Sequence, residues 1–483
     1  MKNKTVITRK AWMHDCMATC SNQFRQSCIH VILLVLVLCS FSFAQFQLPE
    51  YEKYNLPNGL TIYLMEQHEV PFIYVSAIFS AGATKDGLKN GLAASTSESL
   101  VFGTKNYTKD QIEQIVDFNG AELNVSASLE YSTLNSYFLK DNKDALLPVI
   151  KEVIVNPVFP EDEFEKRKQR WLVELDQEKE SPRSVIGSYF KKFIYDDDPY
   201  GNPVNGTKTS VSEISVNDLK NFYKIFYKPE SSAIAIVGDF SSLKMKQKIS
   251  DLFGTWNSEK SQSVTDIVSE LPAHDKSRVL LVNKDNSHET TFYIGQYGIT
   301  RSNPDYIPIQ VINTILGGRF TSWLNAALRI NSGLTYGAGS YFSPYKTSGT
   351  FIISSFTETS STIEAIDMSL EVLDSLHSKG MDEETLNSAK NYMKGQFPLD
   401  YETSGDLASL LVKMFYYNIS DAFINDFQKN VDELTVEKAN EIIKIYFPKG
   451  NLQFVLIGKA SELKGKVSKY GEVIEKEITD IGF

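Results

Sequence analysis

Cysteine is scarce in this sequence, and all of it lies near the start of the chain. The four cysteines are Cys16, Cys20, Cys28 and Cys39. A chain that had lost its first 44 residues would therefore contain no disulfide bond, no thiolate metal ligand and no cysteine nucleophile. Any chemistry in such a chain would have to come from other side chains.

Long apolar runs and an excess of basic charge are also absent. After residue 44 no stretch has 18 consecutive apolar residues, which excludes a protein that spans the membrane several times. The 49 basic and 60 acidic residues give a net charge of −11, whereas a nucleic-acid-binding protein shows a basic excess or a basic patch. Hydrophobic residues (42%) and charged residues (23%) are in the globular range, and 483 residues suggest about two to four domains.

The first 44 residues have the pattern of a secretory signal. Basic residues dominate their start, an apolar run follows at 31–39, and the small residues Ser42 and Ala44 precede Gln45. We predict a signal peptide over 1–44, with translation starting at Met1 or further in. An uncleaved anchor and a lipid anchor at Cys39 are the alternatives, and they are the only membrane attachment that the sequence suggests. Export of a cysteine-free mature chain indicates the periplasm or cell envelope of a Gram-negative bacterium.

The rest of the chain contains a tandem duplication. The segments 211–216 and 431–436 match at an offset of 220 residues, and the match continues without a gap to Gly238 and Gly458. Each copy has a helical pattern, a short turn and an apolar strand. Two units of this length indicate a duplicated domain, because solenoid repeats are shorter.

Strand and helix patterns are mixed within each half. A buried strand is expected at 72–79, a capping box at Thr108 and Gln111 begins a helix, and 161–180 reads as a long charged helix with an apolar stripe. Strands and helices alternate unevenly, so we predict the α+β class. The predicted domains are 45–256 and 276–483, joined by a polar linker at 257–275.

An ordered set of short motifs resembles the insulinase/pitrilysin family of metallopeptidases. The resemblance covers nearly the whole chain after the signal, and it implies two homologous α+β halves in one clamshell-type subunit. The motifs are Asn58-Gly59-Leu60, Gly91-Leu92-Ala93, Phe102-Gly103-Thr104, Asn119 to Asn124, Asn156 to Pro160, Tyr227 to Glu230, Leu316-Gly317-Gly318, Leu328-Arg329 and Gly333 to Gly337.

The zinc motif of active family members is degenerate in this chain. That motif, H-x-x-E-H, places two zinc-binding histidines on one face of a helix and a glutamate that activates water between them. Counted back from Phe102, its three positions fall on Ala94, Ser97 and Glu98. The family's third zinc ligand, a later glutamate, corresponds to Glu174. The resemblance therefore implies that this chain holds no zinc.

The histidine count points the same way. No two histidines after residue 44 lie within two helical turns of each other, so no helical pair of histidine ligands exists there. Glu98 and Glu174 could together bind a hard cation or form an ordinary solvated pair, and the sequence leaves both possibilities open. The four histidines in question are His68, His274, His288 and His377.

The second half retains a different part of the family's machinery. Active members use an arginine and a tyrosine, seven residues apart, to hold the substrate carbonyl while charge develops on its oxygen. Arg329 and Tyr336 occupy these positions, and a guanidinium and a phenol are suitable donors to an oxyanion.

Three hypotheses for the function follow. The first is a zinc-less subunit of a two-subunit peptidase, which is inactive alone and pairs with a homologous zinc-bearing chain around a peptide substrate. In that case zinc, the expected cofactor, belongs to the partner. The second is a scaffold or peptide-binding protein without catalytic function, which would have no need of Arg329 and Tyr336. The third is an independent metallopeptidase with a rebuilt metal site, which the scarcity of histidine disfavours.

Overall fold

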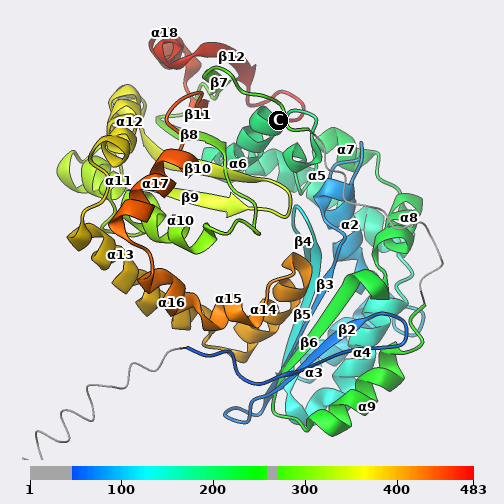
Figure 1. Ribbon diagram of the computed structural model, residues 1–483. Coiled ribbons are helices and arrows are strands. Elements are labelled where there is room, and N and C mark those ends of the chain that lie inside the picture. The colour runs from blue at the N-terminus through cyan, green and yellow to red at the C-terminus, as the bar shows by residue number, and fades with distance from the viewer. Residues whose placement is uncertain (1–45, 258–269) are drawn as a thin grey trace, which may run out of the picture. The chain divides into compact units, whose positions relative to one another are not determined.

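The computed structural model describes residues 46–257 and 270–483 (Figure 1). The chain divides into two compact units, Met1–Gln47 and Leu48–Phe483, and the second contains all the helices and strands of the described residues. The predicted signal peptide (1–44) lies outside the described residues, as does most of the predicted linker (257–275). Across the described ranges, no helix combines the length and the apolar composition that crossing a bilayer requires.

The first half forms a six-stranded mixed sheet. Its strands are β1 (Glu52–Asn55), β2 (Thr61–Glu66), β3 (Phe72–Phe79), β4 (Glu122–Ala127), β5 (Ser132–Leu139) and β6 (Ser232–Gly238). Their order is β1-β2-β6-β3-β5-β4, with β2 and β6 parallel and the other neighbours antiparallel. The central strand β6 is buried along its whole length, as its continuous run of small and branched apolar residues predicts.

Helices cover one face of this sheet. They are α2 (Leu92–Ser99), α3 (Lys109–Phe118), α4 (Lys143–Val155), α5 (Glu161–Glu178), α7 (Lys208–Ser212), α8 (Val216–Phe226) and α9 (Ser242–Phe253). Alternate residues of β3, such as Ile73 and Val75, join one hydrophobic core with side chains of these helices. The predicted capping box is confirmed, since Thr108 and Gln111 bond reciprocally at the start of α3.

The second half repeats the arrangement. Its strands are β7 (Arg278–Asn283), β8 (Glu289–Tyr297), β9 (Ala338–Pro344), β10 (Gly349–Glu358), β11 (Gln453–Gly458) and β12 (Glu472–Glu477), in the order β12-β7-β11-β8-β10-β9. The helices of this half include α10 (Tyr306–Asn313), α11 (Trp323–Asn325), α12 (Thr362–Lys379), α13 (Glu383–Gln396), α15 (Asp421–Asn425), α16 (Phe427–Asp432), α17 (Val436–Tyr446) and α18 (Ala460–Val467).

The predicted α+β class and duplication are confirmed. Helix α17 begins and ends 220 residues after α8. In both sheets a parallel pair (β2 and β6, β7 and β11) is followed by three antiparallel strands in corresponding order. The sheets differ in the sixth strand, because β1 precedes its half in sequence and runs antiparallel, whereas β12 follows and runs parallel.

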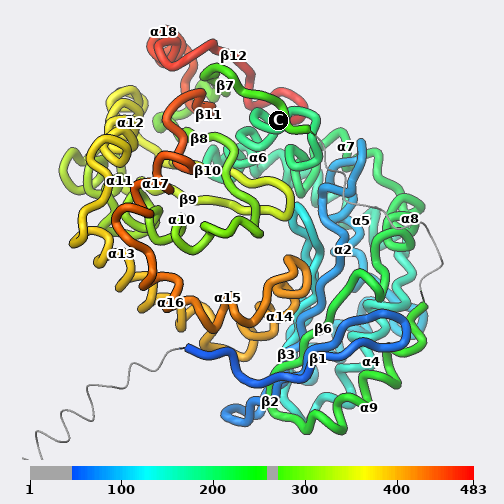
Figure 2. Tube along the Cα trace, viewed as in Figure 1, coloured from blue at the N-terminus to red at the C-terminus, as the bar shows by residue number. Residues whose placement is uncertain are grey.

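The two halves exchange one helix each. Helix α6 (Pro182–Tyr195) belongs to the first half in sequence, but Ile186 and Phe190 pack with Leu280 and Val455 of the second sheet. Conversely, α14 (Ser404–Tyr417) follows the strands of the second half and packs on β3 and β6 of the first sheet. Figure 2 shows both contacts, with the orange α14 beside β3 and β6 and the teal-green α6 beside β8.

A buried glutamate joins the halves where these helices cross over. Glu130, in the turn between β4 and β5, has a relative exposure of 4%. Its carboxylate accepts hydrogen bonds from the hydroxyls of Tyr200 (2.7 Å) and Tyr417 (2.8 Å) and from the backbone N–H of Lys346 (2.7 Å). The Tyr416 hydroxyl donates to its backbone oxygen at 3.0 Å. Residues of both halves therefore meet at one carboxylate.

Candidate functional site

The degenerate zinc motif lies on α2, a short helix packed into the core of the first half. Ala94 and Glu98 are one helical turn apart and line the same surface cleft. Ser97, at the position of the catalytic base, has no exposed surface. A side chain in that environment cannot bind a water molecule that reacts with substrate.

The start of α2 is fixed by a buried carboxylate. Asp86 accepts hydrogen bonds from the backbone N–H groups of Gly91 and Ala93, each at 2.7 Å. Burial raises the pKa of Asp86 to about 8, even though these hydrogen bonds act in the opposite direction. Gly91 has a φ of +94°, and a Cβ there would lie 3.0 Å from the Cα of Gly206. The local backbone conformation and the close contact with Gly206 therefore explain the glycine that begins the motif Gly91-Leu92-Ala93.

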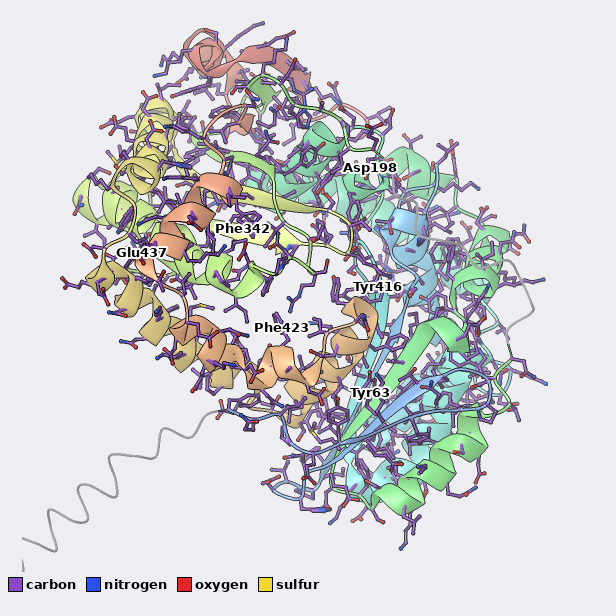
Figure 3. All side chains as sticks on the ribbon, viewed as in Figure 1. Tyr63, Asp198, Phe342, Tyr416, Phe423 and Glu437 are labelled. Carbon is purple, nitrogen blue, oxygen red and sulfur yellow. The ribbon has the colours of Figure 1, made fainter. Side chains whose placement is uncertain are left out.

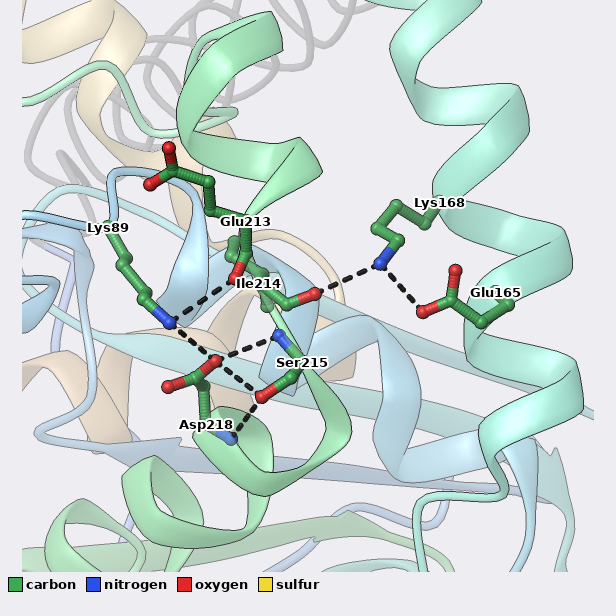
Figure 4. A network of polar contacts seen from close by, with 7 residues as sticks. All are labelled: Lys89, Glu165, Lys168, Glu213, Ile214, Ser215 and Asp218. Carbon is green, nitrogen blue, oxygen red and sulfur yellow. Dashed lines mark hydrogen bonds and ion pairs between the residues drawn. The ribbon is translucent and has the colours of Figure 1, made fainter.

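Hydrogen bonds link α5 and the loop before α2, which carry the degenerate site, to the turn between α7 and α8 (Figure 4). Lys89, in the loop before α2, donates to the Glu213 carbonyl (3.2 Å) and to the Asp218 carboxylate (2.7 Å). Lys168, on α5, is almost fully buried and donates to the adjacent carbonyl of Ile214 at 3.1 Å. Two lysines thus attach α5 and the loop preceding α2 to the same turn, which fixes the relative positions of the two helices.

A guanidinium lies between the two acidic residues of the degenerate site. Arg167, on α5, donates through Nε to Glu98 (2.5 Å) and through Nη1 to Glu174 (2.9 Å). Its guanidinium carbon is 4.8 Å from the ring centroid of Trp171, and only 17% of its side chain is exposed. Burial acts to lower the pKa of Arg167, but the hydrogen bonds that it donates to Glu98 and Glu174, together with their negative charges, outweigh burial and raise the pKa above its usual value.

The residues present in this cleft do not fit zinc. A catalytic zinc ion has three protein ligands, and here Glu98 and Glu174 are already bonded to Arg167 while Ala94 has no ligand atom. The cleft has a volume of about 280 Å³. Within the described ranges no group of three or more metal-binding side chains converges, in this cleft or elsewhere. The guanidinium of Arg167 lies between the two carboxylates, where a metal ion bound to both would have to lie.

Arg329 lies in a π-helical segment of the second half. This segment, Ala326–Asn331, directly follows α11, and π-helical turns occur frequently at functional sites. The guanidinium of Arg329 lies over the ring of Phe320, at 4.8 Å from its centroid, and both side chains are exposed. The cation is therefore presented at the surface on an aromatic support.

Tyr336 lies in a well-anchored loop between this π-helical segment and β9. Its neighbour Thr335 is buried and bonds through Oγ1 to both backbone groups of Gly337, at 3.1 Å each. The hydroxyl of Ser355 also donates to the Gly337 carbonyl at 3.0 Å. Tyr336 itself is 83% exposed. Its phenol projects from a loop whose backbone is held by hydrogen bonds on both sides.

The structure brings only some of the predicted residues together. Glu98 and Glu174 share one cleft with Ala94, whereas Arg329 and Tyr336 lie in the second half and line no part of it. The sequence analysis did not predict a role for Arg167. The spacing of residues 167 and 174, two turns apart on one face of α5, could have indicated that Arg167 lies beside Glu174.

Two models of one peptidase family match this chain. The model described as insulinase (peptidase family M16) matches residues 61–208, and the model described as the peptidase M16 inactive domain matches residues 213–393. The first match lies within the first half and contains the degenerate motif, whereas the second begins just before α8 of the first half and ends within α13 of the second.

The relatives include a protein named as a non-peptidase homologue and a protein named as a zinc protease. A Helicobacter pylori protein named non-peptidase homolog YmxG is 23% identical over 436 residues, covering 89% of this chain and 99% of the relative. The zinc protease PqqE of the same organism is 23% identical over 424 residues, covering 86% and 94%. The crystal structure of a peptidase M16 inactive domain from Pseudomonas fluorescens is similar at a TM-score of 0.79 and 25% identity, covering 85% of this chain and 98% of that one.

Proposed function

Because this chain belongs to the insulinase (M16) peptidase family but has a guanidinium between Glu98 and Glu174, we propose that it is a zinc-less subunit of a two-subunit peptidase. It is inactive alone and pairs with a homologous zinc-bearing chain. In the complex, the partner's zinc activates the attacking water, while Arg329 and Tyr336 of this chain bind the peptide carbonyl. A scaffold or peptide-binding protein of the same fold is the alternative.

The observation that carries the proposal is the contact of Arg167 with Glu98 and Glu174. A site that had merely lost its ligands would leave two carboxylates facing each other across the cleft. Arg167 donates to both, at 2.5 and 2.9 Å, so each carboxylate already has a cationic hydrogen-bond donor, and the single guanidinium offsets one of their two negative charges. The catalytic metal of an assembled enzyme must then come from another chain.

The surroundings of Arg329 and Tyr336 support a role toward a bound molecule. Neither side chain forms a hydrogen bond or an ion pair with another described residue. Donors of this kind remain available to an oxyanion, whose negative charge a guanidinium and a phenol both stabilise. A purely structural arginine and tyrosine would instead be expected to bond within the chain.

The relatives are consistent with a division of labour between two chains. Helicobacter pylori has both a relative named a non-peptidase homologue and a relative named a zinc protease. For the present chain we propose a zinc-bearing homologue as partner and the periplasm or cell envelope as compartment. The compartment rests on the signal pattern of residues 1–44.

The purified chain alone should contain no stoichiometric zinc and should cleave no peptide. The reason is that Ala94, Ser97 and Glu98 stand where two ligands and a base are needed, and that Arg167 is bonded to both remaining carboxylates. Elemental analysis after mild dialysis measures the metal, and a fluorogenic peptide library measures cleavage. About one zinc ion per chain would contradict the proposal.

A matched variant shows whether side chains or the fold exclude the metal. Combining Ala94→His, Glu98→His and Arg167→Ala restores two histidines at helical spacing beside Glu174 and leaves the buried Ser97 untouched. This triple variant should bind about one zinc ion per chain, whereas Arg167→Ala alone should bind none. Zinc in the single variant would mean that Glu98 and Glu174 suffice as ligands.

The chain should form a heterodimer with a homologue that carries H-x-x-E-H and is exported to the same compartment. We expect sedimentation velocity of the co-expressed pair to give one boundary at the mass of both chains. Peptide cleavage should require both chains. Two separate boundaries at micromolar concentration would contradict the subunit proposal. Assembly without any change in the partner's activity on addition of this chain would favour the scaffold.

A further inference from the structure

The second half contains a pocket that the proposed peptidase function does not use. It has a volume of about 490 Å³ and lies where the loop before α10 meets the end of α14 and the start of α17. None of Arg329, Tyr336, Glu98 and Glu174 lines it. Its volume is in the range of small-molecule sites.

The pocket contains an arginine without a counter-ion. The guanidinium carbon of Arg301 is 4.0 Å from the ring centroid of Tyr306 and 4.7 Å from that of Phe423; Phe423, on α15, is labelled in Figure 3. Its Nη1 is buried and has no hydrogen-bond partner, and no described acidic residue forms an ion pair with it. Two aromatic rings fix a cation whose Nη1 has no partner among the described residues.

The other walls of the pocket define the ligand. Lys438 forms an ion pair with Asp305 at 3.6 Å and Glu433 forms one with Lys429 at 3.9 Å, so the guanidinium of Arg301 leaves one positive charge uncompensated. This balance suits an anion with a single charge better than a dianion such as phosphate. Ile307 and Leu434 provide buried apolar surface beside the charged groups. A ligand that satisfies both has one carboxylate on an apolar body.

We propose that this pocket binds a carboxylate attached to an apolar group, held by the guanidinium of Arg301. Such a group occurs at the C-terminus of a peptide that ends in an apolar residue, and also in small apolar carboxylic acids. The site needs neither the partner chain nor Arg329, so it goes beyond the proposed function. Tyr417 lines the pocket and also donates to Glu130, so an occupant contacts the junction of the two halves.

Fluorescence anisotropy with the full chain tests this proposal. The probe is a fluorescein-labelled heptapeptide that ends in Phe-Leu, prepared once with a free C-terminal carboxylate and once as the amide. The acid should bind at least about tenfold more tightly than the amide, because an arginine–carboxylate hydrogen bond is charge-assisted. Arg301→Met should reduce the affinity for the acid to that for the amide. Arg301→Lys, which keeps the charge without the planar fork, should lie between them.

A matched arginine provides the control. The guanidinium carbon of Arg183 lies 3.3 Å from the ring centroid of Phe356, and Arg183 is outside the pocket. Arg183→Met should therefore leave the preference for the acid unchanged. Displacement of the peptide acid by hexanoate would assign the site to small carboxylic acids as well, and failure of hexanoate to displace it would assign the site to peptide termini. Equal affinities for acid and amide, absence of binding, or a preference that survives Arg301→Met in a folded protein would each overturn the proposal.

Discussion

Tyr336→Phe lowers the turnover number of the assembled complex by about 100- to 1000-fold, which is the usual cost of removing one donor to a developing oxyanion. The substitution removes one hydroxyl and keeps the ring. Since Tyr336 is 83% exposed and its hydroxyl bonds to no described residue, the melting temperature and the assembly of the complex should not change. The KM should change less than the turnover number, because the oxyanion exists only after attack on the carbonyl.

Measurement of both the rate and the melting temperature on one preparation separates a catalytic from a structural role. Tyr392→Phe is a suitable control, since Tyr392 is another exposed tyrosine of the second half and lies outside the loop of Tyr336. It should leave the turnover number unchanged. A normal turnover number in a stable Tyr336→Phe complex would remove Tyr336 from the mechanism.

Arg329→Ala should reduce turnover by a similar factor. The side chain is exposed, lies over the ring of Phe320 and forms no hydrogen bond or ion pair with another described residue, so little stability depends on it. Arg329→Lys keeps the charge but loses the fork that can donate twice, and we expect an intermediate rate. A lowered melting temperature together with a normal rate per complex would instead identify Arg329 as a brace of the π-helical segment.

Glu130→Ala should destabilise the chain by about 2 to 4 kcal/mol. The substitution removes the carboxylate that accepts from the Tyr417 hydroxyl and from the Lys346 N–H, while the Tyr200 hydroxyl keeps Thr347 Oγ1 as a partner at 2.9 Å. Each buried polar group that loses its partner costs about 1 to 3 kcal/mol. Relief of the buried negative charge offsets part of that sum. Urea denaturation of the full chain, followed by circular dichroism, measures the loss.

An exposed pair of the same chemistry serves as the control for Glu130. Glu122 accepts a hydrogen bond from the Tyr137 hydroxyl at 2.8 Å, but Glu122 is exposed and Tyr137 is only half-buried. Glu122→Ala should change the free energy of unfolding by less than about 0.5 kcal/mol, since surface substitutions of this kind have small effects. If the two variants lost the same stability, Glu130 would not hold the halves together.

Much of the fold could be predicted because local patterns determine it. The repeat at an offset of 220 residues corresponds to α8 and α17, and the capping box at Thr108 and Gln111 is present. The apolar stripe expected on the long charged helix is the buried face of α5. Patterns of this kind depend on residues close together in sequence, where the period of a helix or strand is visible.

The exchange of helices between halves could not be predicted. The apolar face of α6, with Ile186 and Phe190, would look the same whichever sheet it covered. The contact of Arg167 with Glu98 was hidden for a related reason, since it joins side chains 69 residues apart in sequence. Glu130 is a further case, because nothing local to the turn between β4 and β5 indicates that two tyrosines and a backbone N–H converge on it.

The exchange of α6 and α14 constrains how this protein is synthesised. One face of the first sheet stays without a helix packed on it until α14 has left the ribosome. This happens only after β7 to β10 have been made. Until then an apolar face of β3 and β6 is open to other chains or to chaperones. Two separate copies of one half that traded one helix would form a domain-swapped dimer. Here both copies belong to one chain, so the exchange is a contact within one molecule and not an association between two.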